Sequence, residues 1–352
     1  MKAAFAIPGD IDTLTGGYRY EKRLLEELRA AGRDVAHIEL PGSFPDPSAA
    51  EMTESVATLT AVPADVPLIL DGFLVGALDP AGMAAIRAPI VAMVHHPLAL
   101  ESGLSEARRK YLYDTERANL DHAAHVLVPS PHTAETLQAR YGVAAERISI
   151  ALPGTDRPTQ PGAPVVPPLI LSVGLHHPRK GHDVLLRALA RLTDLDWRAH
   201  ILGRVHDAAS FEMNRSLNVE LGLTDRVTVD GELAEERRDA LYAQASIFAL
   251  ASEYEGYGMV FAEALVRGLP IVSCRAGAIP DTVPEDAGLL VPVGDAGALA
   301  TALRRLLAEP GLRDRMAAAA ARHGAALPGW TDTARVAGQV LDRVAGQAVS
   351  RA

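Results

Sequence analysis

Short apolar runs alternate with stretches of helical periodicity along almost the whole chain. The first run, residues 3–7, is followed by GGYRYEKRLLEELRAAG, in which Leu24, Leu25 and Leu28 share one helical face and Gly32 ends the helix. Strands that are apolar throughout and separated by helices are typical of parallel sheets covered on both faces. Further strands are predicted at residues 35–38, 68–70, 90–94, 126–128, 169–173, 200–202, 227–229, 247–250, 271–273 and 289–291. Helices are predicted near residues 106–123, from about 182, and near 211–221, 235–244, 258–267 and 331–344.

A proline-rich segment divides this alternation into two parts. Residues 156–168, DRPTQPGAPVVPP, lack periodicity, which is typical of an interdomain linker. We therefore expect an α/β protein with two Rossmann-like, doubly wound parallel-sheet domains facing each other across a cleft. The predicted parts are an N-terminal domain at 1–157, completed by a helix within 332–352, a linker at 158–168, and a C-terminal domain at 169–331.

Composition excludes several classes of protein. No apolar run approaches the ~18 residues that span a bilayer, and the start, MKAAFAIPGD, is more typical of a first strand than of a signal peptide. The single cysteine, Cys274, excludes an internal disulfide and favours a reducing compartment, so we expect a cytoplasmic protein. A net charge of −10 argues against nucleic acid as the main partner.

Two cations lie between a predicted strand and a predicted helix. Arg179 and Lys180 follow the strand at 169–173 and directly precede a helix that begins near His182. The start of a helix presents unpaired N–H groups and partial positive charge, which favour an anion. This arrangement predicts a seat for a diphosphate, although the Gly-x4-Gly-Lys-Ser/Thr loop of nucleotide kinases is absent.

A second motif, EYEGYGMVFAEALVRGLPIV, places two carboxylates around a glycine turn. Glu255 follows the strand at 247–250, and Gly256 and Gly258 turn the chain into a helix that carries Glu263. The first helical amides have no intrahelical partner and can bind an anion or sugar hydroxyls. Glu263, within an apolar stretch, is suited to accept both hydroxyls of a ribose, and Glu255 to bind a second sugar.

A glycine pair, Gly16 and Gly17, opens the first predicted helix. Glycine allows a ligand to approach the backbone closely. The spacing does not match Gly-x-Gly-x-x-Gly, so a nicotinamide-dependent oxidoreductase is disfavoured.

Together these motifs resemble the retaining glycosyltransferases of the GT4 family, which have the GT-B fold. The segments that carry the resemblance are EGYGMVFAE with its continuation ALVRGLPIV, SVGLHHPRKGHDVLLRAL, TGGYRYEKRLLEEL, PSPHTAETL, LPGTD, VDGEL and LYAQASIFALAS. They cover most of the chain and are most specific in its C-terminal half. The resemblance implies a nucleotide-sugar donor, UDP- or GDP-linked, from which a hexose is transferred with retention at the anomeric carbon.

The resemblance also implies roles for individual residues. Glu263 would bind the donor ribose, and Glu255 would bind the transferred sugar with Gly256 and Tyr257 beside it. Arg179 and Lys180 would neutralise the leaving diphosphate. The backbone amides expected to help are those of Gly17, Gly258, Met259 and Val260, and the nucleobase is expected near Gly231, Glu232 and Leu233.

Family members commonly place a histidine after a strand of the N-terminal domain. His95 and His96 both fit, and we favour His95, because adjacent side chains at a strand end point in opposite directions. The expected catalytic residues are Glu255, His95, Lys180 and Arg179. One departure is Leu175, which occupies a position where many members have arginine, so Arg179 would supply the second cation.

Several alternatives stay open at this point. A nucleotide-sugar 2-epimerase of similar fold and a non-catalytic nucleotide-sugar binding protein are the rival functions. No metal and no cofactor are expected, since the histidine pairs lack the spacing of zinc ligands. The acceptor, whether a sugar, a lipid-linked compound or a small molecule, is not named by any motif, and the basic segment 107–120 allows a weak contact with the membrane surface. We also expect the linker to permit domain closure over the donor.

Overall fold

The computed structural model describes residues 2–101 and 103–349 and divides into two compact units. The first unit consists of Met1–Gly154 together with Pro328–Ala352, and the second of Thr155–Leu327. Each unit contains one six-stranded sheet, and every strand pair in both sheets is parallel. The predicted pair of doubly wound α/β domains is therefore confirmed.

The N-terminal unit is built around a sheet with strand order β2-β1-β3-β4-β5-β6. Its elements are β1 (Lys2–Pro8), α1 (Gly16–Ala30), β2 (Asp34–Leu40), α2 (Ala49–Thr60), β3 (Leu68–Leu70), α3 (Gly72–Ala77), α4 (Pro80–Ala85), β4 (Ile90–Met93), η1 (Leu98–Leu100), α5 (Glu106–His122), β5 (His125–Val128), α6 (Pro131–Thr136), η2 (Leu137–Tyr141), η3 (Ala145–Arg147), β6 (Ile148–Ile150) and α14 (Trp330–Val349).

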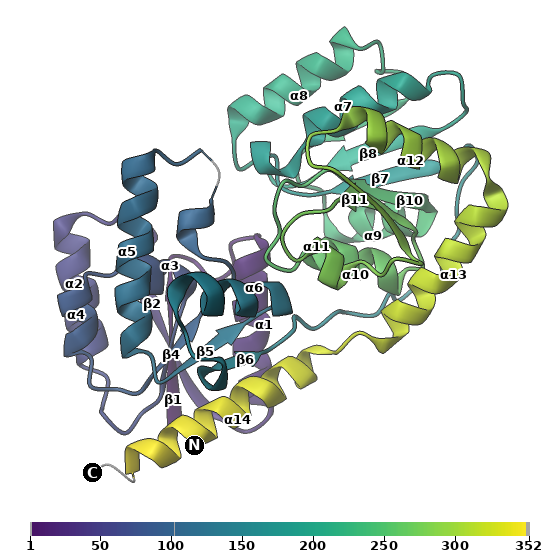
Figure 1. Cartoon of the computed structure of the whole chain (residues 1–352). Helices are drawn as coiled ribbons and strands as arrows, with labels where there is room; N and C mark the ends of the chain where they lie inside the picture. Colours follow the sequence, from purple (N-terminus) through teal and green to yellow (C-terminus); the bar gives the residue numbers. More distant parts are fainter. Residues whose placement is uncertain (1, 102, 350–352) are drawn as a thin grey trace. The chain divides into compact units, whose positions relative to one another are not determined.

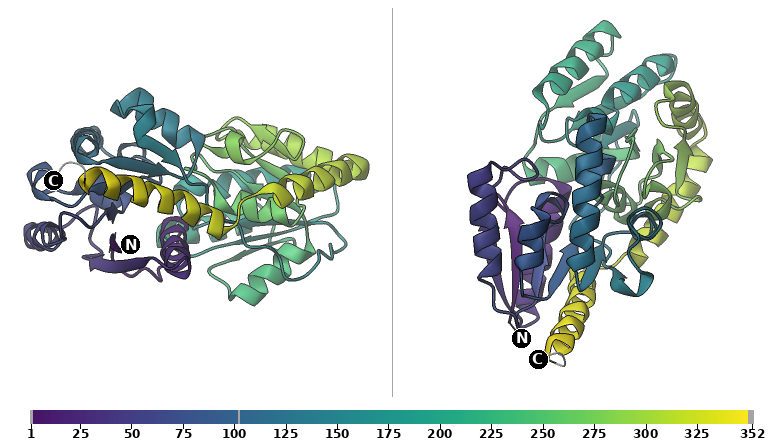
Figure 2. Two further views of the ribbon diagram at one scale, coloured as in Figure 1. Left: turned by 90° about the horizontal axis from the view of Figure 1, so that it is seen from below. Right: turned by 60° about the vertical axis from the view of Figure 1, so that its left-hand side comes forward.

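The last helix belongs to the N-terminal unit although it follows the whole C-terminal unit in the chain. Helix α14 packs against α1 and against β4, β5 and β6, as the yellow helix in Figures 1 and 2 shows. Arg33 and Asp342 form a two-pronged ion pair at this contact, with nitrogen–oxygen distances of 2.8 and 2.7 Å. The predicted return of a C-terminal helix to the first domain is therefore confirmed.

The C-terminal unit has a sheet with strand order β12-β11-β10-β7-β8-β9. Its elements are β7 (Leu169–Val173), η4 (Pro178–Lys180), α7 (His182–Leu189), η5 (Ala190–Leu192), β8 (Arg198–Leu202), α8 (Ala208–Glu220), β9 (Val227–Asp230), α9 (Glu235–Gln244), β10 (Ala245–Leu250), α10 (Met259–Val266), β11 (Ile271–Cys274), α11 (Ile279–Thr282), β12 (Gly288–Val291), α12 (Ala296–Ala308) and α13 (Pro310–Ala326).

Both faces of this second sheet are covered by helices. Helices α7, α8 and α12, with Met316 of α13, contribute to the apolar core on one face, and α9, α10 and the rest of α13 contribute to it on the other (Figure 1). Strands β7 and β10 lie in the middle of the sheet and are buried along almost their whole length. Their carboxyl ends are therefore adjacent, and the loops that leave them can bring side chains together.

Sequence periodicity does not predict several strands and helices of the two units. It does not predict β6, α2, α12 or α13, although α12 carries an apolar face that includes Leu299, Leu303 and Leu306. The predicted helices near 182, 211–221, 235–244 and 258–267 correspond to α7 to α10 within a few residues. No helix in the part of the chain that is described is long and apolar enough to cross a membrane.

Candidate functional site

The loop after β7 holds the two predicted cations against the end of β10. Gly181 adopts a left-handed conformation, with φ +61°, and a Cβ there would lie 2.2 Å from the carbonyl oxygen of Ala251. The Glu253 amide donates to the Arg179 carbonyl at 2.8 Å, and an Arg179 guanidinium N–H donates to the Tyr254 carbonyl at 2.6 Å. Close approach at a glycine thus fixes where the basic side chains lie.

Lys180 and Glu255 form a buried ion pair at this edge of the sheet. The Lys180 ammonium lies 2.5 Å from Oε1 of Glu255, and the Ser252 hydroxyl donates to the same oxygen at 2.6 Å. Arg179 lies farther away, with 3.9 Å between its nitrogen and Oε2 of Glu255. Burial raises the pKa of Glu255, but the two cations outweigh burial, so its pKa lies below the usual value and Glu255 is ionised at neutral pH.

The start of α10 follows directly in the chain. Gly258 caps the helix in a left-handed conformation, with φ +85°, and Met259 and Val260 form its first turn. Helix geometry leaves these first amides without intrahelical acceptors. The preceding Gly256 and Tyr257 form the turn, and the Thr282 hydroxyl fixes it by donating to the Tyr257 carbonyl at 2.6 Å. The predicted glycine turn therefore lies beside the ion pair, and the first amides of α10, which follow it, have no acceptor within the helix.

Glu263 lies one turn further along α10 with an unforeseen partner. Its side chain is buried, and Oε2 accepts a hydrogen bond from the Tyr242 hydroxyl of α9 at 3.0 Å. The Arg267 guanidinium stacks 4.4 Å from the centre of the Tyr242 ring. Burial and the carboxylate of Glu263 raise the pKa of Tyr242 well above its ordinary value, so the phenol stays a hydrogen-bond donor.

The predicted nucleobase segment lies at the end of the neighbouring strands. Gly231, Glu232 and Leu233 follow β9, and the Gly203 amide after β8 donates to the Gly231 carbonyl at 3.2 Å. Leu175 lies in the loop after β7, where its carbonyl is 3.2 Å from Nε2 of His182. The segment therefore occupies the same edge of the sheet as the ion pair.

In the N-terminal unit, His95 follows β4 at the carboxyl edge of the sheet. Its Nε2 lies 3.2 Å from Oε1 of Glu21, on the inward face of α1, and Asp71 after β3 completes a cluster within 4.8 Å. Burial lowers the pKa of His95, so the ring is neutral at pH 7. Gly17 adjoins this ring, because a Cβ there would lie 3.6 Å from Cδ2 of His95. The structure thus brings two predicted residues, Gly17 and His95, together with two carboxyls.

His96 has a different environment. Its Nε2 lies 3.1 Å from Oε2 of Glu101 beside η1, and its side chain is part-exposed. The two adjacent histidines therefore have separate carboxylate partners, as expected for consecutive residues at a strand end.

Glu21, Asp71 and Tyr242 are among the residues of these sites that were not predicted from the sequence. Glu21 could have been found, because it lies three, four and seven residues before Leu24, Leu25 and Leu28 and so shares their buried helical face. Asp71 directly follows a buried strand, which is also a detectable signal. Tyr242 gave none, since its meeting with Glu263 depends on how α9 packs beside α10.

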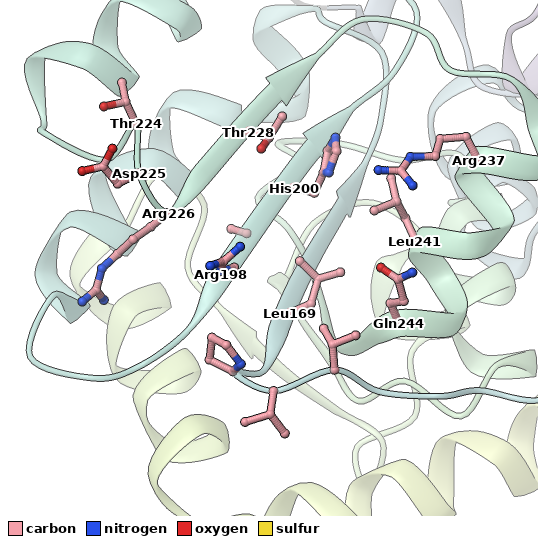
Figure 3. Close-up of a pocket in the computed structure, with 14 residues that line it drawn as sticks. Leu169, Arg198, His200, Thr224, Asp225, Arg226, Thr228, Arg237, Leu241 and Gln244 are labelled. Carbon is pink, nitrogen blue, oxygen red and sulfur yellow. The ribbon is translucent and has the colours of Figure 1, made fainter.

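A hollow in the C-terminal unit lies over β7, β8 and β9, beside α9 (Figure 3). Arg198 and His200 of β8 and Thr228 of β9 line it, with Arg237 of α9 at its side. Its lining, as far as the chain is described, contains none of the residues predicted to bind a nucleotide sugar. This hollow and the edge of the sheet that carries Lys180 are therefore different places.

Comparison with protein families gives two adjoining matches. The model for glycosyl transferases group 1 matches residues 156–323, and the model for glycosyltransferase family 4 matches residues 71–157. The chain belongs to the GT4 glycosyltransferases. The first of these matches contains Arg179, Lys180, Glu255 and Glu263, and the second contains Asp71 and His95.

Individual relatives agree with this family assignment. A D-inositol 3-phosphate glycosyltransferase from Corynebacterium efficiens is 31% identical over 265 residues, which span 67% of this chain and 62% of that protein. Among solved structures, sucrose-phosphate synthase from Thermosynechococcus elongatus has a TM-score of 0.82 at 23% identity, covering 97% of this chain and 98% of that one. Anabaena HepE in complex with UDP-glucose has a TM-score of 0.76 at 17% identity, covering 97% and 100%. The GT4 chain therefore has the GT-B fold, while its match spans about three fifths of its curated relative.

Proposed function

We propose that this GT4 protein transfers a hexose from a nucleotide diphosphate sugar to a hydroxyl of an acceptor, with retention of anomeric configuration. The observation that carries the proposal is the buried Lys180–Glu255 pair, which lies with Arg179 beside the unpaired amides of α10. Cations, amides and a carboxylate within one loop cluster suit a substrate with both a diphosphate and a sugar. The UDP-glucose held by HepE, which shares this fold, supports such a donor.

The leaving group is the diphosphate. Lys180 carries three N–H donors, so it can contact a phosphate oxygen while it keeps its bond to Glu255. Arg179 adds positive charge and the first amides of α10 add hydrogen-bond donors. Both are already in place before the nucleotide sugar binds. Such preorganised donors stabilise charge that develops in the transition state, and loss of one typically costs about 10²–10³ in turnover.

The sugar ring gains positive charge as its bond to the diphosphate lengthens. Glu255, ionised and fixed by Lys180 and Ser252, is suited to bind sugar hydroxyls and to stabilise that charge. Because Oε1 already accepts from Lys180 and Ser252, we assign Glu255 an electrostatic and positioning role and not that of a nucleophile. The acceptor hydroxyl then attacks the face that the diphosphate leaves, and a phosphate oxygen of the leaving group takes its proton.

The nucleoside is held by other groups of the same unit. Glu263 would accept the ribose hydroxyls through Oε1 while Oε2 stays bonded to Tyr242. Gly231, Glu232 and Leu233 would flank the base. In the N-terminal unit, His95 would bind a hydroxyl of the transferred sugar, and the amide of Gly17 a phosphate.

A donor screen tests the proposal directly. The full chain is incubated with UDP- and GDP-hexoses, without acceptor, and release of nucleoside diphosphate is followed alongside thermal unfolding with UDP, GDP, ADP and NAD. We expect slow hydrolysis of one donor and stabilisation by its nucleoside diphosphate but not by NAD. Stabilisation by NAD alone, or isomerisation of the sugar in place of hydrolysis, would contradict the proposed transfer.

A further inference from the structure

The cluster of Glu21, Asp71 and His95 in the N-terminal unit contains two carboxyl groups and one imidazole. Glu21 is 1% exposed and Asp71 is 4% exposed, and a carboxyl oxygen of each lies within 4.8 Å of the other. Two buried carboxylates this close repel each other and have lost their hydration, so they cannot both stay ionised. At least one proton is therefore bound to this pair when the structure is as observed.

The backbone around Asp71 shows which oxygen is available for that proton. Oδ1 of Asp71 accepts a 2.7 Å hydrogen bond from the Phe73 amide as the cap of α3. The other oxygen is then the one that can carry a proton toward Glu21. Burial, followed by the charge of Glu21, raises the pKa of Asp71 well above its ordinary value, and burial raises that of Glu21 to about 7. The larger rise, at Asp71, favours a proton on that residue at neutral pH.

His95 occupies the other side of Glu21. Its Nε2 lies 3.2 Å from Oε1 of Glu21, and its ring packs edge-on against Tyr20 with centroids 5.2 Å apart. With the proton of the carboxyl pair on Asp71, Glu21 can only accept, so Nε2 carries the hydrogen and Nδ1 is the lone-pair nitrogen of the neutral ring. Within residues 2–101 and 103–349, Nδ1 of His95 has no hydrogen bond of its own.

The remaining titratable groups that face the cluster leave this arrangement unchanged. They are Tyr18 and Tyr20 on α1. The charge of Asp10, in the loop after β1, helps to raise the pKa of Tyr18. Burial raises the pKa of Tyr18 to about 12 and that of Tyr20 above its ordinary value, so both phenols stay neutral. Their hydroxyls donate to the carbonyls of Pro8 and Ala151 and do not compete for the carboxyls.

We propose that Asp71 keeps a proton at neutral pH and donates it to Glu21, which thereby fixes His95 in its Nε2–H tautomer and presents Nδ1 as a hydrogen-bond acceptor. Glu21 and Asp71 are positioning residues, and His95 is the group that meets the substrate. The last step rests on the proposed transferase function, in which Nδ1 accepts a hydroxyl hydrogen of the transferred sugar. A cationic or Nδ1–H histidine would instead donate there.

The tautomer is tested without any measurement of activity. Ring ¹⁵N shifts of His95 are recorded in the full chain between pH 6 and 9 and assigned with the His95→Asn variant. We expect a neutral ring with hydrogen on Nε2 in the wild type and in Asp71→Asn, whose amide can still donate to Glu21, and loss of that preference in Glu21→Leu. A cationic ring at pH 7, or hydrogen on Nδ1, overturns the proposal.

Kinetics test the consequence for the reaction. Misplacing a group that contacts the substrate costs on the order of 10²-fold, so Glu21→Leu should lower kcat/KM about 100-fold. Wild-type activity should fall at alkaline pH as Asp71 ionises, and Asp71→Asn should retain most activity and lose that fall. Equal losses in Glu21→Leu and Asp71→Asn would overturn the proposal. If no donor is turned over, the proposed function fails, while the tautomer result stands by itself.

Discussion

The ammonium of Lys180 lies 2.5 Å from Oε1 of Glu255, and the two side chains are only 11% and 9% exposed. The exposed pair of Lys110 and Asp114 has the same separation, 2.5 Å, with 75% and 55% exposure. The two pairs therefore have the same separation but differ in how far their side chains are exposed to water. In the buried pair each charge depends on the other, because neither is solvated.

Lys180→Ala should therefore impair both folding and turnover. Removing one partner leaves a buried carboxylate, which typically costs about 3–5 kcal/mol of unfolding free energy. Loss of a donor to the leaving diphosphate should lower kcat by about 10²–10³. Denaturant unfolding and donor hydrolysis measure the two effects. Lys110→Ala is the matched control and should change stability by less than about 1 kcal/mol; equal losses in both variants would disprove the special status of the buried pair.

Tyr242→Phe should weaken donor binding while leaving the chemical step intact. The variant removes the hydrogen bond that orients Glu263 but keeps the ring beneath Arg267. Loss of a hydrogen bond to a charged group costs about 1.5–3 kcal/mol, so KM for the donor should rise by roughly tenfold or more, with kcat little changed. Tyr113→Phe, which removes a hydroxyl bonded to the Arg140 carbonyl in the other unit, serves as control. A fall in kcat with unchanged KM would contradict a ribose-binding role for Glu263.

Gly181→Ala should damage the loop that carries the cations. Gly181 and Gly222 both have positive φ, +61° and +67°, but only Gly181 has backbone within reach of a new Cβ, at 2.2 Å. The conformational cost alone is about 1–2 kcal/mol, which Gly222→Ala should show in denaturant unfolding. Gly181→Ala should lose more stability and also donor turnover, because the loop must move away from Ala251. If the two variants lose equal stability and turnover is unaffected, the close contact has no functional consequence.

Glu116→Gln should stabilise the protein at high pH. Glu116 is fully buried on α5, and burial raises its pKa to about 8, from 4.5 in an exposed carboxyl. Between these pH values the folded protein keeps a proton that the unfolded chain releases, so stability falls as pH rises, by at most about 1.4 kcal/mol per pH unit. Glutamine removes that dependence. Unfolding at pH 5 and pH 8.5 should therefore show a gain over wild type that is larger at pH 8.5, whereas exposed Glu54→Gln should show none; a gain independent of pH would exclude this explanation.

The sequence by itself determined the chain of strands and helices and the loops that carry chemistry. Apolar runs such as residues 169–173 and 247–250 have few options besides buried parallel strands. Because parallel strands end at one edge of a sheet, Arg179, Lys180 and Glu255 could be predicted to lie close together from local order alone. The helix starts beside Gly17 and Gly258 were predictable for the same reason, since glycine turns are local.

Only the tertiary structure decided which side chains pair. The Tyr242–Glu263 bond depends on the packing of α9 beside α10, and the carboxyl pair depends on Glu21 of α1 lying close to Asp71, which follows β3. The protonation state of each buried carboxyl could likewise not be predicted from the sequence. The shift of a carboxyl's pKa follows from its burial and its neighbours and not from its residue type. Local pattern fixes where the chain turns, whereas contacts between elements distant in sequence fix the charge and hydrogen bonding of each group.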